Sequence, residues 1–476
     1  MNNFVLNKIE IYNYGKCIVN TNFTDGINLN INNENDDFYS LIIGENASGK
    51  SYLLFLIADI FSFLDKKINR KPRINELKYE KYNICYSIKG KYYDVAIQKN
   101  QVSVVDEQKE NLQINELVLP TRIIASSYLF NDKFKFSLNE NDSIYKYCGV
   151  KQTSNAMFLS HDSKKLLKNI VKLNRKEKIE VLTKTLSNVG YENKITIQGI
   201  RSNKSKMLSL HELIDQRKNR TLVNNIIEKM DMEEQHLLED YVNENQGLKV
   251  DLELKNFDEN HNKDVLLNHI RNMDILTDIG YYNRIDISFY KDDEAIDFHQ
   301  LSSGEKQLLS TFLSIGSELE DNSLILIDEP EVSLHPNWQL TFIHQLENVL
   351  GAQYKNCHFI ISTHSHLMVS SLYPERSSLV INTREGNIRK SELILYDTYA
   401  WSAENILYRV FGVRTLRNIY VENDLQRLIN YISKENKNDS LQDIQEIINN
   451  LKKIELTKDD PLTAFLEKVD KKIEGD

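Results

Sequence analysis

The segment from Gly44 to Ser51 has the sequence GENASGKS, whose glycines, lysine and serine can bind a polyphosphate. Backbone N–H groups of such a loop point toward the β-phosphate, and the N-terminus of the following helix adds partial positive charge. Gly44 and Gly49 let the backbone approach the phosphates closely. Lys50 would reach the β- and γ-phosphates and would face solvent without ligand, and the Ser51 hydroxyl would ligate Mg²⁺. We therefore predict a phosphate-binding loop.

Two acidic residues, Asp328 and Glu329, follow the apolar run at 324–327, which has the character of a buried strand. Beside a phosphate-binding loop, Asp328 would hold Mg²⁺ through water, and Glu329 would orient or deprotonate the attacking water. Alone, an apolar run followed by two acids is a weak signal, and the loop in the same chain makes it specific. The two segments together predict phosphoryl transfer to water.

A third segment, LSSGEKQ at 301–307, is a Ser/Gly turn that opens a predicted helix. A helix N-terminus of this kind can bind an anion. The same residues also fit an ordinary capped helix, with Ser302 or Ser303 as the cap and Glu305 as its partner in a capping box. Both interpretations stay open from the spacing alone.

A histidine, His364, follows the apolar run at 358–362 and could reach a γ-phosphate. The alternative is a hydrogen-bonded histidine at the end of a strand. The neighbouring His358 and His366 could suggest a metal site, but no carboxylate partners accompany them. We therefore do not predict a metal centre at these histidines.

These segments require a scaffold of buried strands and helices. Apolar and β-branched residues alternate at 4–12, an apolar run at 38–43 leads into the glycine loop, and a helix is predicted from about Lys50. Strand signals return at 285–290, 324–327 and 358–362, with helices between them, which favours a mostly parallel sheet. The chain from 161 to about 246 and from 401 onward has helical spacing.

Composition limits the classes of function. Acidic residues outnumber basic ones by 69 to 59, so a chain-wide basic coat for nucleic acid is absent. Four dispersed cysteines form no CxxC pair, which argues against a zinc site or a disulfide framework and favours a reducing compartment. No apolar stretch is long enough to cross a membrane, so we expect a cytoplasmic protein. Local basic clusters could still contact DNA: Lys164 with Lys165, Arg175 with Lys176, Arg201 with Lys204 and Lys206, and Arg217 with Lys218.

Taken in order, these motifs resemble those of ABC-type ATPase heads. The segment 301–307 is similar to the LSGGQ signature and Asp328–Glu329 to the Walker B pair, while 333–335 occupies the D-loop position and His364 that of the switch histidine. The resemblance implies ATP and Mg²⁺ as cofactors, Glu329 and His364 as catalytic residues, and Ser51 and Asp328 as metal ligands. The residues that it implies at the nucleotide are Gly44, Asn46, Gly49, Lys50, Ser51, Ser303, Gly304, Glu305 and His335.

The resemblance also implies the architecture. About 250 residues separate Ser51 from the signature segment, which is typical of heads split by an insertion, as in the structural-maintenance (SMC), RecF and OLD groups. We expect an α/β fold, with a mixed sheet and flanking helices, in which a second head supplies the signature, so that the chain acts as a homodimer. Four parts are predicted: a first part of the head with Walker A at 1–135, a mainly helical insertion at 136–284, the rest of the head at 285–400, and a helical C-terminal region at 401–476.

The segments DEPEVSLHP and STHSH are similar to the corresponding sequences of the OLD group and its prokaryotic defence relatives. The segments 119–134 and 401–413 are similar to the PtuA family, the ATPases of Septu anti-phage systems, and to related retron ATPases. This resemblance implies a sensor or regulatory ATPase that controls a separate HNH nuclease, a PtuB-like partner. An apolar stripe at helical spacing would either dock this partner or pack on its own head; it consists of Trp401, Ile406, Leu407, Val410 and Phe411.

The chain departs from the ABC pattern and carries two weak nuclease signals. The segment 125–131 lacks a Q-loop glutamine, and Gln152 is the nearest one downstream. The segment 419–424 is similar to the first strand of a TOPRIM domain, but too little chain follows it. Asp251, Glu253 and Lys255 resemble a carboxylate–lysine nuclease motif, yet their alternation with apolar residues predicts an amphipathic strand.

We expect ATPase activity but no nuclease activity from this chain. The alternatives are a retron-associated ATPase, a RecF-like DNA repair ATPase, and an OLD-like nuclease with an unrecognised site.

Overall fold

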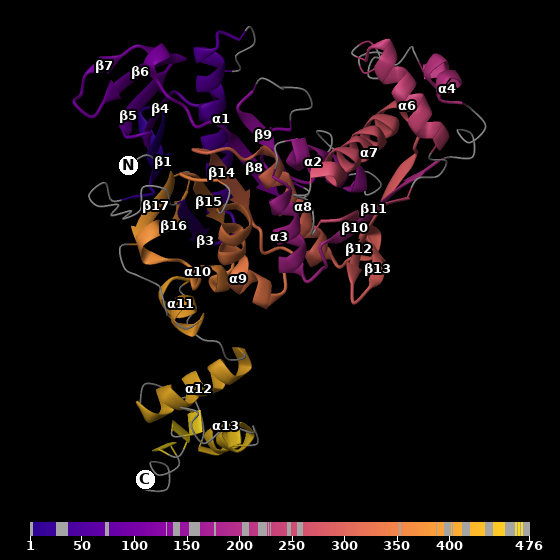
Figure 1. Cartoon of the computed structure of the whole chain (residues 1–476). Coiled ribbons are helices and arrows are strands. Elements are labelled where there is room, and N and C mark those ends of the chain that lie inside the picture. Colours follow the sequence, from indigo (N-terminus) through magenta and orange to yellow (C-terminus); the bar gives the residue numbers. More distant parts are fainter. Residues whose placement is uncertain are drawn as a thin grey trace. The chain divides into compact units, whose positions relative to one another are not determined.

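A computed structural model gives the fold of the chain (Figure 1). Contacts divide the chain into two compact units, residues 1–406 and 407–476. Apart from a few single residues and pairs, the structure describes residues 3–24, 37–71, 76–129, 131–136, 143–151, 162–175, 178–201, 209–217, 230–244, 249–254, 260–351, 354–386, 388–394, 403–411, 419–433 and 441–452.

The first unit is built on a large mixed sheet with the strand order β7-β6-β5-β4-β1-β2-β17-β16-β3-β15-β14-β8-β9. The strands from β16 to β9 in this order are parallel, and those from β7 to β2 are antiparallel. The predicted α/β fold with a mixed sheet is therefore confirmed. The strands are β1 (Val5–Asn13), β2 (Lys16–Asn22), β3 (Phe38–Gly44), β4 (Lys81–Ile88), β5 (Lys91–Gln98), β6 (Gln101–Asp106), β7 (Asn111–Leu112), β8 (Ile123–Ser127), β9 (Tyr145–Tyr147), β14 (Leu324–Asp328), β15 (His358–Ser362), β16 (Ser377–Glu385) and β17 (Ile388–Ile394).

Uninterrupted apolar runs form the centre of this sheet. Every residue of β8, β14 and β15 is buried, as is β3 up to its terminal Gly44. Strands covered on both faces need such runs, because neither face meets water. Helix α1 (Lys50–Ile68) contacts β3, β8, β14 and β15, and its Leu54 and Ile57 share a buried cluster with Leu326 of β14. This packing fixes the start of α1 at the carboxyl ends of these strands.

A second, antiparallel sheet has the order β11-β10-β12-β13, with β10 (Lys194–Ile200), β11 (Lys249–Glu253), β12 (Arg284–Lys291) and β13 (Glu294–Asp297). The prediction that the strand at 285–290 belongs to the mostly parallel sheet was wrong. Its residues alternate between buried and more exposed, a pattern typical of an antiparallel sheet with one covered face. Because β10 pairs with β12, the insertion is joined to the segment just before LSSGEKQ.

Helices cover both sheets and form the second unit. Helices α2 and α3 pack on α8, and α2 also packs on α7. No helix among the described residues is long and apolar enough to cross a membrane. The remaining helices are α2 (Asp162–Arg175), α3 (Ile179–Val189), α4 (Leu210–Arg217), α6 (Met232–Glu244), α7 (Asn260–Ile279), α8 (Ser303–Glu318), α9 (Pro336–Leu346), α10 (His366–Val369), α11 (Ala403–Arg409), α12 (Ile419–Ile432) and α13 (Leu441–Lys452).

The C-terminal region is helical, as predicted. Helices α12 and α13 pack around a small apolar core that includes Leu428, Ile444 and Ile448. The segment 419–424, which is similar to the start of a TOPRIM domain, opens helix α12 and is not a strand. In the stripe of α11, Ile406 and Val410 are buried, so these two residues are not available for docking.

Candidate functional site

The predicted phosphate-binding loop connects β3 to α1 with a backbone that only small residues tolerate. Gly44, Ala47 and Gly49 have φ angles of 152°, 64° and 98°. A Cβ atom on Gly44 would collide with the carbonyl oxygen of Asn382 in the neighbouring β16. Gly49 is the N-cap of α1 and offers no side-chain acceptor, so the first-turn N–H groups lack a side-chain cap. An anion is the natural partner of such a helix end.

Lys50 is buried, with only 4% of its surface exposed. Its Nζ donates to the carbonyl oxygens of Gly44 at 3.0 Å and Glu45 at 3.2 Å, and lies 2.8 Å from Nε2 of His364. The expectation that Lys50 faces solvent was therefore wrong. A buried ammonium must find acceptors, and the loop carbonyls and the imidazole supply them. Burial lowers the pKa of Lys50, while the charges of Glu329 and nearby carboxylates oppose this shift.

The two predicted metal ligands lie together. Asp328, at the end of β14, is 1% exposed and accepts hydrogen bonds from the hydroxyls of Ser362 and Ser51. Burial raises the pKa of Asp328, because a carboxylate out of water needs a nearby positive charge to stay ionised. A hydroxyl and a carboxylate are hard oxygen donors of the kind that Mg²⁺ prefers. Ser51 and Asp328 therefore fit the metal that the motifs imply.

Glu329 and His364 face each other beside Lys50. Glu329 has a positive φ of 48°, and its N–H donates to the Ser362 carbonyl at 2.9 Å, which fixes the turn after β14. Its Oε1 lies 3.6 Å from Nε2 of His364. The neighbouring His364 imidazole lowers the pKa of Glu329, so this carboxylate is ionised at neutral pH. The site thus holds an ionised acid next to an imidazole and a lysine.

Glu331 is a site residue that the sequence reasoning did not single out. Its Oε1 accepts the backbone N–H of His364, which anchors the turn after β15. Burial raises the pKa of Glu331. The available signal was its place two residues after Glu329 in the segment DEPE. Nothing local distinguishes it from an ordinary turn residue, because its partner is 33 residues away.

The signature segment forms a capped helix start. The Ser302 side chain accepts from the N–H of Glu305 at 3.3 Å, and Glu305 Oε2 accepts from the N–H of Ser302 at 2.8 Å. Tyr191 also donates to Glu305 Oε1 at 2.9 Å. The capping box is therefore present. The Glu305 carboxylate is engaged within the chain, whereas the adjacent Ser303 is exposed at the first turn of α8.

The segment 333–335, at the predicted D-loop position, packs directly on the turn of the signature-like segment 301–307. A Cβ atom on Gly304 would lie 2.8 Å from the Ser333 carbonyl oxygen and 2.9 Å from Cζ3 of Trp338. Gln307 of α8 donates to the Pro330 carbonyl oxygen at 2.6 Å. His335 is exposed and caps α9, its Nδ1 accepting from the N–H of Asn337 at 3.3 Å. These contacts link the signature to the segment that follows Walker B.

The segment 125–131, where a Q-loop glutamine was expected, is followed by a buried carboxylate, Asp132. Asp132 accepts from the Tyr147 hydroxyl at 2.6 Å and from Nζ of Lys151 at 2.9 Å. Its charge contributes to raising the pKa of Asp328, although burial of Asp328 is the main cause. Gln152, the nearest glutamine downstream, lies outside the described residues.

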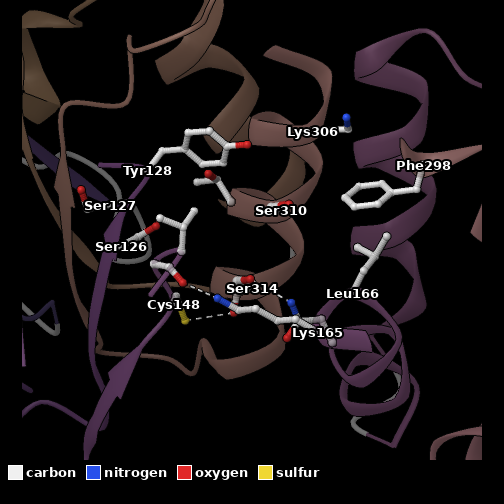
Figure 2. Close-up of a pocket in the computed structure, with 14 residues that line it drawn as sticks. Ser126, Ser127, Tyr128, Cys148, Lys165, Leu166, Phe298, Lys306, Ser310 and Ser314 are labelled. Atoms are coloured by element: carbon white, nitrogen blue, oxygen red, sulfur yellow. Dashed lines mark hydrogen bonds between the residues drawn. The ribbon is translucent and has the colours of Figure 1, made fainter. Parts of the chain in front are cut away.

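A cavity lies between the end of β8, helix α2 and helix α8 (Figure 2). Serines 126 and 127, Lys165 and Lys306 contribute to its polar lining. Lys165 donates to the Gly149 carbonyl oxygen, and Lys306 donates to that of His299 at 2.8 Å. None of the residues predicted to bind nucleotide lines this cavity, which is therefore distinct from the phosphate-binding loop.

Other candidate residues have structural roles. His358 is fully buried, accepts the N–H of Leu6 at 3.1 Å and lies 2.9 Å from the Ser40 hydroxyl, and burial lowers its pKa to about 3. It is a hydrogen-bonded core histidine. Among the residues that the structure describes, no group of three or more His, Cys, Asp or Glu side chains could hold a metal.

The basic clusters are partly engaged within the chain. Lys164 pairs with Asp278 at 2.8 Å, and the Arg201 guanidinium lies 4.0 Å from the ring centre of Tyr281. Lys176, Lys204, Lys206 and Lys218 lie outside the described residues.

Most of the residues predicted to bind nucleotide and metal lie together at one edge of the sheet. They are Gly44, Gly49, Lys50, Ser51, Asp328, Glu329 and His364, and Asn46 is exposed in the loop.

Comparison with known protein families gives one match that covers most of the chain. Residues 5–369 match the family described as AAA ATPase domain. The chain belongs to this ATPase family. The matched region includes the loop at 44–51, the signature segment, Asp328–Glu329 and His364, so the family assignment and the motifs point to the same site.

Several known proteins are related to the chain in sequence. The retron Vc95 probable ATPase of Vibrio cholerae is 24% identical over 72% of this chain and 68% of its own length. The retron Ec83 probable ATPase of Escherichia coli is 33% identical over 17% of this chain and 16% of its length. Septu protein PtuA of Bacillus thuringiensis is 28% identical over 29% of this chain and 38% of its length. The predicted relationship to retron and Septu ATPases is confirmed.

Solved structures similar to this ATPase include SMC heads. The SMC head domain from Thermotoga maritima has a TM-score of 0.37 at 11% identity and covers 82% of this chain and 99% of its own. The Pyrococcus furiosus Smc head bound to the C-terminal domain of ScpA has a TM-score of 0.33 at 11% identity, covering 87% of this chain and 100% of its own.

Proposed function

We propose that this chain binds ATP with Mg²⁺ and hydrolyses it at the carboxyl ends of β3, β14 and β15. The observation that carries the proposal is the meeting of Lys50, Glu329 and His364, which come from three separate segments. A phosphate-binding cation, an ionised carboxylate and an imidazole are the groups that phosphoryl transfer to water requires. Membership of the ATPase family supports the same reaction.

The geometry suggests how the residues act. The phosphate oxygens of ATP would replace the carbonyls of Gly44 and Glu45 as acceptors for Lys50. Glu329, already ionised, would accept the proton of the attacking water, and His364 would contact the γ-phosphate once Lys50 turns to the ligand. Ser51 and Asp328 would hold Mg²⁺, which neutralises charge on the phosphate oxygens.

The signature would act on the ATP of a second copy of the chain. Helix α8 packs against β8, whereas the phosphate-binding loop follows β3, and two strands, β15 and β14, lie between them. At roughly 4.8 Å per strand, β8 lies about 14 Å from β3 across the sheet, a spacing that favours a signature acting on the nucleotide of a second subunit. We therefore propose a head-to-head homodimer in which each Ser303 faces the partner's nucleotide.

We propose that the chain is the regulatory ATPase of an anti-phage defence system and controls a separate HNH nuclease, as a PtuA-like protein would. The similarity to Septu protein PtuA supports this role. The similarity to two retron ATPases favours a second candidate, a retron-associated ATPase. The neighbouring gene separates them, since an HNH nuclease without a reverse transcriptase supports the first and a reverse transcriptase supports the second.

A single preparation tests these proposals. The chain, expressed with its neighbouring genes, should release phosphate from ATP in Mg²⁺ but not in EDTA, and should co-purify with the nuclease. The chain alone, incubated with plasmid DNA, Mg²⁺ or Mn²⁺ and ATP, should not cut. Cutting by the chain alone that persists after substitution of Asp328 and Glu329 would mean that it carries its own nuclease site.

A further inference from the structure

Arg389 lies against the phosphate-binding loop but belongs to β17, a strand that none of the sequence motifs includes. Within the sheet it pairs with Arg384 of β16 and Val19 of β2. A Cβ atom added to Gly49 would collide with the Arg389 side chain and lie 2.6 Å from its Cδ. The guanidinium carbon lies 4.6 Å from the ring centre of Tyr52 in the first turn of α1. Arg389 therefore contacts the turn in which the loop becomes a helix.

The guanidinium of Arg389 has an unused hydrogen-bond donor. Its Nε is buried and has no hydrogen-bond partner among the described residues. A buried N–H group without a partner costs free energy, and an anion that accepts from it removes that cost. Stacking on Tyr52 orients the planar guanidinium, so its donors are fixed in direction. These features are those of an arginine prepared to bind a phosphate.

The strand order gives the direction in which a triphosphate crosses the loop. Glu329 and His364, the γ-phosphate residues, follow β14 and β15 on one side of β3. Strands β16 and β17 lie on the other side of β3. A triphosphate whose γ-phosphate faces Glu329 and His364 therefore extends its α-phosphate and nucleoside toward β16 and β17. Arg389 contacts the loop from this side.

We propose that Arg389 binds the α-phosphate of the nucleotide and that Tyr52 holds its guanidinium in position. This inference rests on the proposed binding of ATP at the loop. The α-phosphate is common to ATP and ADP, so Arg389 sets the affinity for both. Lys50 and His364 instead contact the end of the nucleotide that changes on hydrolysis.

The test compares Arg389→Ala with Lys390→Ala. Lys390 is a matched control because it is exposed and follows Arg389 in β17, so its side chain lies on the opposite face of the sheet. Calorimetric titrations use ATP, ADP and inorganic tripolyphosphate, each with Mg²⁺. Arg389→Ala should weaken the binding of all three ligands by about tenfold, the value of one charge-assisted hydrogen bond, while Lys390→Ala leaves their binding unchanged. Arg389→Lys, which keeps the charge but not the planar fork, should recover only part of the loss.

The outcomes separate this inference from the proposed function. A folded Arg389→Ala variant that binds ADP as tightly as the wild type overturns the role of Arg389 and leaves the ATP site intact. If Arg389→Ala loses affinity for ATP and ADP but not for tripolyphosphate, Arg389 contacts the nucleoside. This result also overturns the proposed role of Arg389 at the α-phosphate. Absence of nucleotide binding by the wild type overturns the proposed function itself. Thermal unfolding without nucleotide checks the fold, and Arg389→Gln replaces the alanine variant if that variant unfolds.

Discussion

Nζ of Lys50 lies 2.8 Å from Nε2 of His364, so the lysine of the proposed phosphate-binding loop and the proposed switch histidine are in contact. An ammonium group only donates, so Nε2 of His364 has to act as the acceptor in a hydrogen bond with Lys50. The same nitrogen lies 3.6 Å from Glu329 Oε1, toward which it would have to donate. A bound nucleotide that draws Lys50 away from His364 would therefore change the hydrogen-bonding partner of Nε2 of His364.

Lys50→Met keeps the length of the side chain and removes the charge. We expect ATP affinity to fall and hydrolysis to stop, because no other cation of the loop faces the β- and γ-phosphates. The fold should persist, since Met fills the volume of a lysine that burial already penalises. Calorimetry, phosphate release and thermal unfolding measure the three effects. Wild-type turnover in Lys50→Met would contradict the assignment of the loop.

His358 makes the stability of the chain sensitive to acid. Its pKa is lowered from 6.5 to about 3 in the folded chain, so the unfolded chain binds a proton below pH 6.5 that the folded chain does not. Stability is therefore lost as pH falls from about 6.5 toward 3, by at most about 1.4 kcal/mol per pH unit. In His358→Gln, the unfolding free energy between pH 7 and 5 should fall less steeply than in the wild type. Equal slopes in both proteins would contradict the buried neutral histidine.

Mixed dimers test the composite site. Gly304→Asp is unsuitable for inactivating the signature segment in this test, because a side chain at Gly304 would collide with Ser333 and Trp338. Ser303→Glu is better: an acidic residue suits a helix N-terminus, yet it repels a γ-phosphate offered by another subunit. Lys50→Met and Ser303→Glu chains, each inactive alone, should recover part of the ATPase activity when mixed. No recovery in subunits shown to exchange would argue for a site within one chain.

Local signals predicted the parts of the site that local sequence determines. The strands before Gly44, Asp328 and His364 were expected within a residue or two of their observed ends, because each is an apolar run closed by a turn. The capping box of Ser302 and Glu305 was one of two open interpretations and is present.

Contacts between distant segments could not be predicted. Lys50 contacts His364, 314 residues away, and no periodicity encodes that contact. Arg389 belongs to the hairpin of β16 and β17, whose role depends on pairing with β3 and β2. The strand at 284–291 was expected in the wrong sheet because its partner, β10, lies in the insertion.

The central claim is that Glu329 is the base for ATP hydrolysis at this site. Glu329→Gln keeps the shape of the side chain and leaves Asp328 in place, so Mg²⁺-dependent ATP binding should be retained. Single-turnover phosphate release, measured with enzyme in excess over ATP, tests the claim most directly. The rate should fall by roughly 10²–10⁴-fold in Glu329→Gln, the usual contribution of general-base catalysis. Release at the wild-type rate would contradict the claim and make His364 the next candidate for the base.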